Sequence, residues 1–394
     1  MRILMVTHNY PRFAGDHAGS FVARLASGLV SRGHVVRVVA PHAPDVPTSE
    51  VVDGVEIRRF RFGTDGMERV AYRGDLHQRS AFDPSAIVGI PAMLLAYAAA
   101  VRRESRQFLP NVIHAHWWFP GGAFAVRSRT PTVITCHGSD VRLLDRGGPL
   151  LAFGRATLRR AAAVTCVSEF LTRDVTRIVP ELQGQVRTIY MPLDLTPFER
   201  VSAIPKVDPP VILFVGNLVP SKGTSVLLDA FAALHRGGVR CTLRIVGRGA
   251  QEAVLRQQAR ALGIDAQVEW AGFVPQGRIA SEYAAATVVA LPSRGQAEGL
   301  GLVLAEALLS GTAVVASPAG GIPEVVRDGE TGLIARDGDA AHLAAQIRRL
   351  LEDPGLRERL TAAGSIRARG MFSLAVATDA FERVYAGMTH SGRS

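Results

Sequence analysis

Cysteine is scarce in this chain of 394 residues, which holds only three. Cys136, Cys166 and Cys241 are widely spaced, and no Cys-X-X-Cys pair or Cys/His cluster occurs. This pattern argues against a disulfide framework and a structural zinc site, and it is typical of a protein from a reducing compartment. We therefore expect a cytoplasmic globular protein.

Long hydrophobic runs are lacking as well. The longest uncharged apolar run, 86–101, contains Pro91 and is shorter than the roughly 20 residues that cross a bilayer. The opening segment, 1–10, has too short an apolar stretch for a signal peptide and predicts a first strand instead. We expect no transmembrane helix.

Lysine is almost absent, because only Lys206 and Lys222 stand among 45 basic residues. The net charge is +10, and residues 1–200, with 25 basic and 17 acidic side chains, carry +8 of it. That excess would suit an anionic partner, such as the inner face of the cell membrane, but a GC-rich genome would raise the arginine content of any protein. Both explanations stay open. No basic stripe with interleaved aromatic residues occurs, so we expect no nucleic-acid partner.

What the sequence has in plenty is an alternation of β-branched runs with amphipathic segments. The predicted strands are 2–7, 34–41, 111–116, 130–137, 162–168 and 186–190, then 211–218, 240–247, 267–274, 287–293, 312–317 and 331–336. The predicted helices include 19–33, 225–236, 250–262 and 278–286. Such alternation predicts an α/β fold with two tandem Rossmann-like domains and a deep inter-domain cleft as the ligand site.

The proline-rich stretch 198–210 has no clear period and is the predicted linker. We place an N-terminal Rossmann-like domain at 1–200, the linker at 201–210 and a C-terminal Rossmann-like domain at 211–372. A C-terminal helix at 373–394 would end the chain, with the option that it packs back on the N-terminal domain.

The stretch PSRGQAEGLGLVLAEALLSG places two glutamates around a Gly-Leu-Gly. Glu298, Gly299, Leu300 and Gly301 fall where a strand ends and a helix begins, and free amides at a helix N-terminus bind anions. A simpler interpretation is that Glu298 complements the helix dipole. Glu306 lies in an apolar helical segment, and a buried carboxylate needs hydrogen-bond donors. Ribose hydroxyls would supply them, and so would an arginine.

The loop GNLVPSKG, 216–223, is a second candidate phosphate site. Gly216 and Gly223 flank a turn after a predicted strand, and Lys222 precedes the next helix. In a chain so rich in arginine, a lysine here suggests a need for a compact ammonium, although an ordinary surface lysine is the alternative. The loop after the first strand carries Gly19 before a helix, which is a weaker signal of the same kind.

Two predicted strand ends in the first half carry polar and aromatic side chains at the edge where ligands gather. His137 and Asp140 follow one strand, and His116, Trp117 and Trp118 follow the other. At a cleft edge the tryptophans would stack on a sugar or a lipid head group. A structural histidine and a pair of core tryptophans are the alternatives.

The sequence Asp-Gly-Asp at 337–339 has the form of a metal-binding motif, but it precedes an amphipathic segment and predicts a helix N-cap. We expect no essential metal and no cofactor.

Together these motifs resemble the retaining, nucleotide-sugar-dependent glycosyltransferases of the GT-B fold, specifically family 4, also called glycosyl transferases group 1. The resemblance covers nearly the whole chain. Its most specific part is the Glu-X7-Glu from Glu298 to Glu306, followed by GGIPEVVRDGETG at 320–332. The segments GNLVPSKG and CHGSD match two further motifs of the family.

The resemblance implies transfer of a sugar from a nucleoside diphosphate sugar to an acceptor hydroxyl, with retention at the anomeric carbon and without a metal. It makes residues 1–200 the acceptor-binding domain and residues 211–372 the nucleotide-sugar-binding domain. It places Glu306 on the ribose, Lys222 on the diphosphate, Glu298 on the donor sugar and His137 near the reacting carbon. The donor-binding set is Gly19, Gly216, Asn217, Lys222, Glu298, Gly299, Leu300, Gly301 and Glu306, the catalytic set is His137, Lys222 and Glu298, and the acceptor set is His116, Trp117, Trp118 and Asp140. The acceptor is a glycan, a glycolipid or a natural product, and a lipid-linked one would bring peripheral membrane contact through the basic N-terminal domain.

Three positions depart from the family pattern. Asn217 stands where an arginine is usual, so Arg248 or Arg294 would have to replace that diphosphate cation. The segment MPLD, 191–194, replaces the usual NGVD, and the loop 293–298 is two residues longer than the common form. A nucleotide-sugar epimerase and a non-catalytic GT-B partner subunit are the alternative functions.

Overall fold

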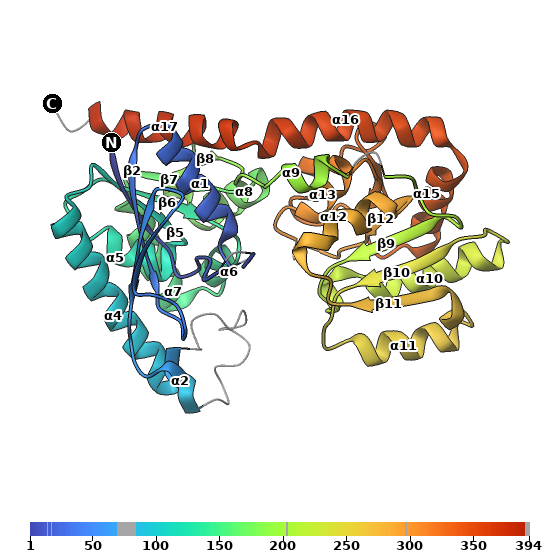
Figure 1. Cartoon of the computed structure of the whole chain (residues 1–394), viewed down its shortest axis with the longest axis horizontal. Coiled ribbons are helices and arrows are strands. Elements are labelled where there is room, and N and C mark those ends of the chain that lie inside the picture. The colour runs from blue at the N-terminus through green and yellow to red at the C-terminus, as the bar shows by residue number, and fades with distance from the viewer. Residues whose placement is uncertain (14, 17, 69–83, 202–203, 296–297, 391–394) are drawn as a thin grey trace. The chain divides into compact units, whose positions relative to one another are not determined.

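The computed structural model describes residues 1–13, 15–16, 18–68, 84–201, 204–295 and 298–390. The chain divides into two compact units (Figure 1). The first comprises Met1–Leu193 and Leu374–Ser394, and the second comprises Asp194–Ser373. Each unit is built on its own, mainly parallel, sheet, which confirms the predicted α/β fold with two Rossmann-like domains.

The sheet of the first unit has eight strands in the order β3-β4-β2-β1-β5-β6-β7-β8. They are β1 (Arg2–Val6), β2 (Val35–Pro41), β3 (Ser49–Val52), β4 (Val55–Phe60), β5 (Val112–His116), β6 (Thr132–Cys136), β7 (Ala163–Cys166) and β8 (Val186–Thr188). Only β3 pairs in the antiparallel sense, with β4. This hairpin was not predicted, and its signal is the turn Asp53-Gly54, whose φ angles of 49° and 76° fit a two-residue hairpin loop.

Both faces of this sheet are buried, as continuous apolar strands require. Along β1, Ile3 and Met5 enter one hydrophobic core, and Leu4 and Val6 enter the other. Helices α1 (Ser20–Ser31) and α17 (Leu374–His390) cover the first core. The second core is covered mainly by α4 (Pro84–Phe108), α5 (Ala123–Ala125), α6 (Ser139–Asp145), α7 (Gly148–Arg159) and α8 (Glu169–Ile178), beside the short elements α2 (Asp65–Glu68), η2 (Trp118–Gly122) and η3 (Pro180–Leu182).

The second unit has a six-stranded parallel sheet in the order β11-β10-β9-β12-β13-β14. The strands are β9 (Val211–Val215), β10 (Thr242–Val246), β11 (Val268–Gly272), β12 (Val288–Leu291), β13 (Ala313–Ala316) and β14 (Leu333–Ile334). All six were predicted from the β-branched runs. The start of the predicted linker, 198–210, overlaps the short helix α9 (Thr196–Glu199).

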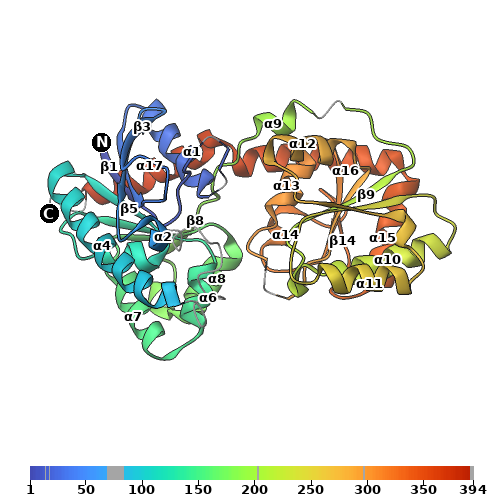
Figure 2. The same cartoon turned by 60° about the horizontal axis from the view of Figure 1, so that its bottom comes forward.

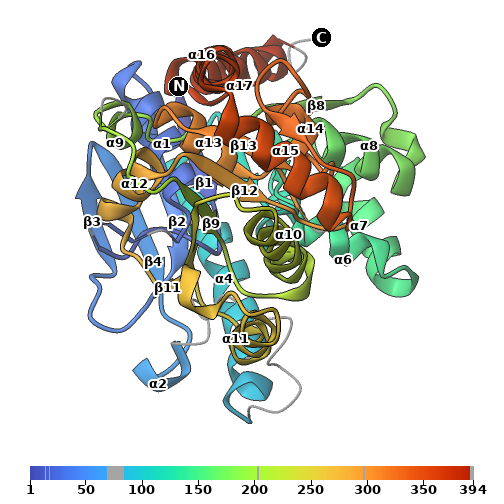
Figure 3. The same ribbon diagram turned by 90° about the vertical axis from the view of Figure 1, so that its right-hand side faces the viewer.

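Helices cover both faces of the second sheet (Figure 2). On one face lie α10 (Thr224–Arg236), α11 (Glu252–Ala261) and α15 (Ala340–Glu352), and Figure 3 shows α15 beside α10. On the other lie α12 (Gln276–Ala285), α13 (Leu302–Leu309) and α16 (Pro354–Phe372), and α14 (Ile322–Val325), η4 (Pro220–Lys222) and η5 (Asp265–Gln267) are short elements in the loops. None of the helices that the structure describes combines the length and the hydropathy that a membrane span needs.

Candidate active site

The loop after β9 carries Lys222 and is seated directly on the end of β12. Gly223 caps α10 with a φ of +67°, and a Cβ at this position would lie 1.9 Å from the carbonyl oxygen of Pro292. Only glycine combines this left-handed conformation with so close a backbone approach. The sequence therefore fixes Lys222 against the carboxyl end of the neighbouring strand.

Lys222 and Glu298 form an ion pair at the carboxyl edge of the second sheet. The Nζ atom of Lys222 lies 2.5 Å from Oε2 of Glu298, and the same oxygen accepts a hydrogen bond from the Ser293 hydroxyl at 2.9 Å. Both charged side chains keep some exposure, 24 % for lysine and 12 % for glutamate. The two candidate catalytic residues of this unit are thus in direct contact.

Gly299, Leu300 and Gly301 lead from Glu298 into the N-terminus of α13, as predicted from the sequence. Gly301 is the N-cap residue, and the side chain of Leu300 is buried, so Leu300 offers a ligand only its backbone. Gly320 closes this turn from the loop after β13, because a Cβ there would lie 1.8 Å from the Glu298 carbonyl oxygen. The result is a glycine-lined turn with free helix amides beside an ammonium group.

Glu306 lies on α13, about one helical turn after the first residue of this helix, Leu302. Its Oε2 accepts a hydrogen bond of 2.8 Å from the Tyr283 hydroxyl, on α12. Burial raises the pKa of the Glu306 carboxyl to about 7, and the Tyr283 hydrogen bond opposes this rise only in part. The partner is therefore a tyrosine and not the arginine that the sequence left open. A carboxyl in this state has capacity for further donors.

Gly216 and Asn217 begin the same loop, and Asn217 is exposed. The backbone amide of Leu218 donates to the Arg248 carbonyl at 3.0 Å, which places Arg248 beside this turn. Arg294 lies across the loop, where its amide donates to the Ser221 carbonyl at 2.8 Å. The two arginines considered as replacements thus both flank the Lys222 loop.

In the first unit, the ends of β5 and β6 bring His116 and His137 together. Nδ1 of His116 lies 3.1 Å from Nε2 of His137. Burial, then the neighbouring histidines, holds the pKa of both imidazoles well below the usual value. The centre of the Trp117 ring lies 4.3 Å from that of His137, and the Phe21 ring lies 5.0 Å from it. His137 is therefore a neutral imidazole held among aromatic rings.

Asp140 organises the turn that follows His137. Its carboxylate accepts hydrogen bonds from the amides of His137, Gly138, Val141 and Trp118, at 2.9 to 3.2 Å. Burial raises the pKa of this carboxyl, and the backbone hydrogen bonds oppose the rise. The geometry accounts for Asp140 as the residue that shapes the turn, and its predicted acceptor contact stays a prediction.

The two tryptophans differ in what they touch. Trp118 is fully buried in the core, and its indole N–H donates to the Asp140 carbonyl at 2.7 Å. Trp117 is 7 % exposed and donates its indole N–H to the Ser139 hydroxyl, and its ring packs at a tilt against the rings of His137 and His8. Trp118 is therefore a core residue, which was the alternative interpretation of the two tryptophans, whereas Trp117 borders the pair of His116 and His137.

Gly19 caps α1 with a φ of +66°, and a Cβ there would lie 2.0 Å from the Asn9 carbonyl oxygen. This close approach folds the loop after β1 back onto the start of α1. The predicted donor and catalytic residues thus form two groups, Gly19 and His137 in the first unit and the others in the second.

Four neighbours of these groups were not among the predicted site residues: Ser293, Tyr283, His8 and Phe21. His8 directly follows the predicted strand 2–7, and Ser293 is the last residue of the predicted strand 287–293, so their place at a strand end was a usable signal. Tyr283 and Phe21 lie within helices and carry no local signal, because only packing brings them to their partners.

Two further features lie apart from these groups. Asp339 accepts a hydrogen bond from the amide of His342 at 2.8 Å and caps α15, as predicted. No group of three metal-ligating side chains occurs among the described residues.

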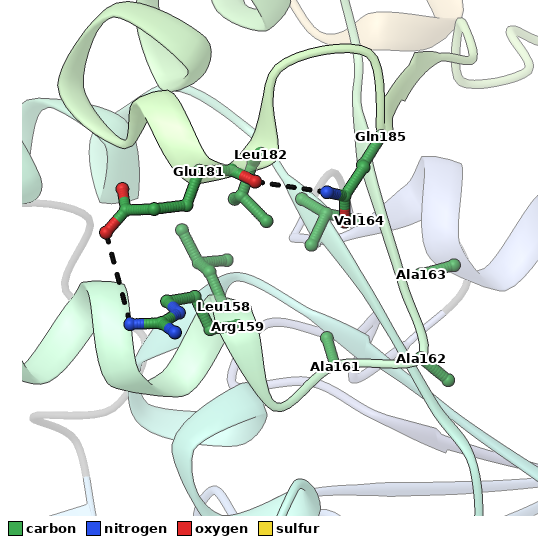
Figure 4. A pocket seen from close by; sticks show the side chains of 9 residues that line it. All are labelled: Leu158, Arg159, Ala161, Ala162, Ala163, Val164, Glu181, Leu182 and Gln185. Carbon is green, nitrogen blue, oxygen red and sulfur yellow. Dashed lines mark hydrogen bonds and ion pairs between the residues drawn. The ribbon is translucent and has the colours of Figure 1, made fainter.

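A hollow of about 260 Å³ lies at the amino ends of β7 and β8, the opposite edge from His137. Its polar rim is self-paired, because Glu181 binds arginines of α7 and its carbonyl accepts from Gln185 (Figure 4).

Two family models match the chain. The model described as Glycosyltransferase Family 4 matches residues 18–196, and that described as Glycosyl transferases group 1 matches residues 196–367. A D-inositol 3-phosphate glycosyltransferase from Acidothermus cellulolyticus is 32 % identical over 386 residues, covering 88 % of this chain and 80 % of the relative.

Two solved structures share the fold at lower identity. A sucrose-phosphate synthase from Thermosynechococcus elongatus superposes with a TM-score of 0.78 at 23 % identity, covering 99 % of each chain. The Anabaena protein HepE, in complex with UDP-glucose, gives a TM-score of 0.68 at 19 % identity, covering 98 % of this chain and 100 % of HepE. With the matched families and the two parallel-sheet units, these likenesses show that the chain is a glycosyltransferase of the GT-B fold and belongs to family 4, the glycosyl transferases group 1.

Proposed function

We propose that the protein transfers a sugar from a nucleoside diphosphate sugar to an acceptor hydroxyl with retention of anomeric configuration. The observation that carries the proposal is the Lys222–Glu298 ion pair, whose glutamate lies in the loop that leads into α13. An ammonium group on one loop and the N-terminus of a helix that follows its carboxylate partner on the next loop suit a diphosphate. Glu306, further along the same helix, would accept from the ribose hydroxyls.

In this proposal catalysis is mainly electrostatic. The bond from the anomeric carbon to the phosphate oxygen breaks while the acceptor oxygen bonds to the same face, and the leaving phosphate takes the acceptor's proton. Lys222 and the helix amides would meet the charge that grows on the diphosphate, so neither a metal nor a separate base is needed. His137, neutral in this environment, would bind the donor sugar by hydrogen bonding.

Arg248 is the residue that we propose in place of the missing arginine at Asn217. Its carbonyl anchors Leu218, one residue beyond Asn217, and its side chain has no carboxylate partner among the described residues. By contrast, Nε of Arg294 lies 3.8 Å from Oδ1 of Asp337, and this carboxylate partly neutralises the charge of the guanidinium. Arg248 therefore has the charge available for a diphosphate.

The acceptor is proposed to be a hydroxyl of a glycan, a glycolipid or a small natural product, and the protein to act in the cytoplasm with peripheral contact at the inner face of the membrane. The support for this contact is the outer face of α4. Leu95 is 74 % exposed there, and Arg102, Arg103 and Arg106 line a hollow with Ala98, Ala99 and Gln107. An exposed leucine followed by three arginines suits an anionic bilayer surface.

The first test is the thermal shift of the purified protein with UDP, GDP, ADP, TDP and CDP, with and without Mg²⁺. Ligand at about 100 times its Kd stabilises the native state by about 2.7 kcal/mol. We expect one nucleoside diphosphate to raise the Tm equally with and without metal, and Lys222→Ala and Glu306→Ala to abolish the rise.

Lys206→Ala is the matched control, because it removes the only other lysine. Its Nζ binds the Ala284 carbonyl and the Thr312 hydroxyl, away from the Lys222 loop. The ligand-induced rise should survive in this variant even if the starting Tm changes. No rise with any nucleotide in the folded wild type would contradict the proposal, and product NMR at the anomeric proton would test retention.

A further inference from the structure

Three imidazoles lie in a row, each tilted against the next, inside the first unit, and the row ends at the candidate site. The ring centres of His114 and His116, both on β5, are 4.3 Å apart, and those of His116 and His137 are 5.2 Å apart. At the inner end, Tyr385 of α17 and Thr135 each bond one nitrogen of His114, both at 2.7 Å. His114 and His116 are fully buried, whereas His137 is partly exposed.

The contact between His116 and His137 joins two ring nitrogens, so one must carry a proton and the other a lone pair. Burial holds both rings neutral by lowering their pKa, and a neutral imidazole has one N–H. Either Nδ1 of His116 donates to Nε2 of His137, or Nε2 of His137 donates to Nδ1 of His116. The two arrangements differ in which proton each ring carries on its other nitrogen.

The environment of His116 decides between them. Its Nε2 is buried and has no hydrogen-bond partner among the described residues. If His137 were the donor, this Nε2 would carry a buried, unpaired N–H. If His116 is the donor, the same atom is an unpaired acceptor, and buried orphan donors are the rarer of the two in proteins.

We propose that His116 is a positioning residue, which donates from Nδ1 to His137 and thereby fixes His137 as the tautomer with its proton on Nδ1. The remaining polar atom of His137, its Nδ1, is then a hydrogen-bond donor and has no lone pair to accept a proton. This assignment goes beyond the proposed function, and its consequence for turnover rests on that function: His137 donates to an oxygen of the bound donor and does not take a proton from the acceptor.

The test is long-range 1H–15N NMR of the protein labelled with 15N-histidine, because the two nitrogens of a neutral imidazole have distinct shifts in each tautomer. His137→Gln identifies the His137 signals. The wild type should show His137 protonated on Nδ1, and protonation on Nε2 would overturn the proposal outright. This readout needs neither substrate nor turnover, so it stands apart from the test of the proposed function.

Two variants of His116 separate positioning from packing. His116→Asn keeps an amide N–H near the place of Nδ1, and His116→Phe keeps the ring but removes the donor. The ring proton of His137 should stay on Nδ1 in His116→Asn and should move at least partly to Nε2 in His116→Phe. With an active donor–acceptor pair, His116→Phe should lose about tenfold or more in kcat with a smaller change in KM, and His116→Asn should recover part of it. Unchanged His137 signals in folded His116→Phe would contradict the role of His116, and if that variant does not fold, the wild-type spectrum decides.

Discussion

We expect Glu306 to make nucleotide binding depend on pH. Its pKa of about 7 means that the carboxyl is partly protonated near neutrality, whereas ribose hydroxyls donate best to the carboxylate. Binding should therefore release a proton, and the Kd for the preferred nucleoside diphosphate should rise by about tenfold per pH unit below pH 7 and level off above it. Calorimetric titration from pH 5.5 to pH 8.5 measures this profile.

Two substitutions control for the titration of the nucleotide itself. Glu306→Gln should bind more weakly at pH 8 and lose the part of the slope that belongs to Glu306. Tyr283→Phe removes the hydrogen bond that lowers the Glu306 pKa, so the profile should move to higher pH. A profile identical in all three proteins would mean that Glu306 does not contact the nucleotide.

Arg248 and Arg294 make a second comparison at the scale of residues. Loss of a charge-assisted hydrogen bond to the diphosphate should weaken binding by about tenfold, so Arg248→Ala should show that loss. Arg294→Ala should change the Kd by less than about threefold, because Asp337 already shares its charge. Equal effects, or the reverse order, would assign the compensating role differently.

At the scale of elements, glycines set how the loops of the candidate site pack. Gly223→Ala places a methyl group against the Pro292 carbonyl, whereas Gly238→Ala, also at positive φ, meets nothing within 4 Å. Both variants bear the left-handed conformation, at about 1–2 kcal/mol. We expect the denaturant concentration at the unfolding midpoint to be clearly lower for Gly223→Ala than for Gly238→Ala, and we expect Gly223→Ala to lose nucleotide binding. Similar midpoints would show that the Lys222 loop tolerates displacement.

Elements were predictable where local pattern and burial agree. The apolar runs of β1 and β9 and the glycines around Lys222 identified the strands and the turn, because a parallel strand is buried on both faces. The β3–β4 hairpin was missed although Asp53-Gly54 is a strong turn signal, since its strands mix charged and apolar residues. The sequence also predicted that the loop 293–298 is two residues longer than the common form, and part of this loop lies outside the described residues.

At the scale of the whole molecule, the proposed membrane contact can be tested through the uneven charge. Arg102→Glu with Arg106→Glu reverses two charges on the outer face of α4 and should abolish sedimentation with vesicles of anionic lipid at low salt. The control is Arg278→Glu with Arg359→Glu, which changes the net charge equally at exposed positions of the second unit. Equal loss in both pairs would mean that only net charge matters, and no binding by the wild type would contradict membrane contact.

The sequence by itself determined the alternation of strands and helices, the two Rossmann-like halves and the loops that carry Lys222 and Glu298, because hydrophobic period and glycine position act locally. The tertiary structure alone decided the partners. Tyr283 reaches Glu306 from another helix, and Tyr385 reaches His114 across 271 residues. Burial then sets the pKa of Glu306 and the neutrality of His137, and burial depends on the packing of the whole unit, which no local segment encodes.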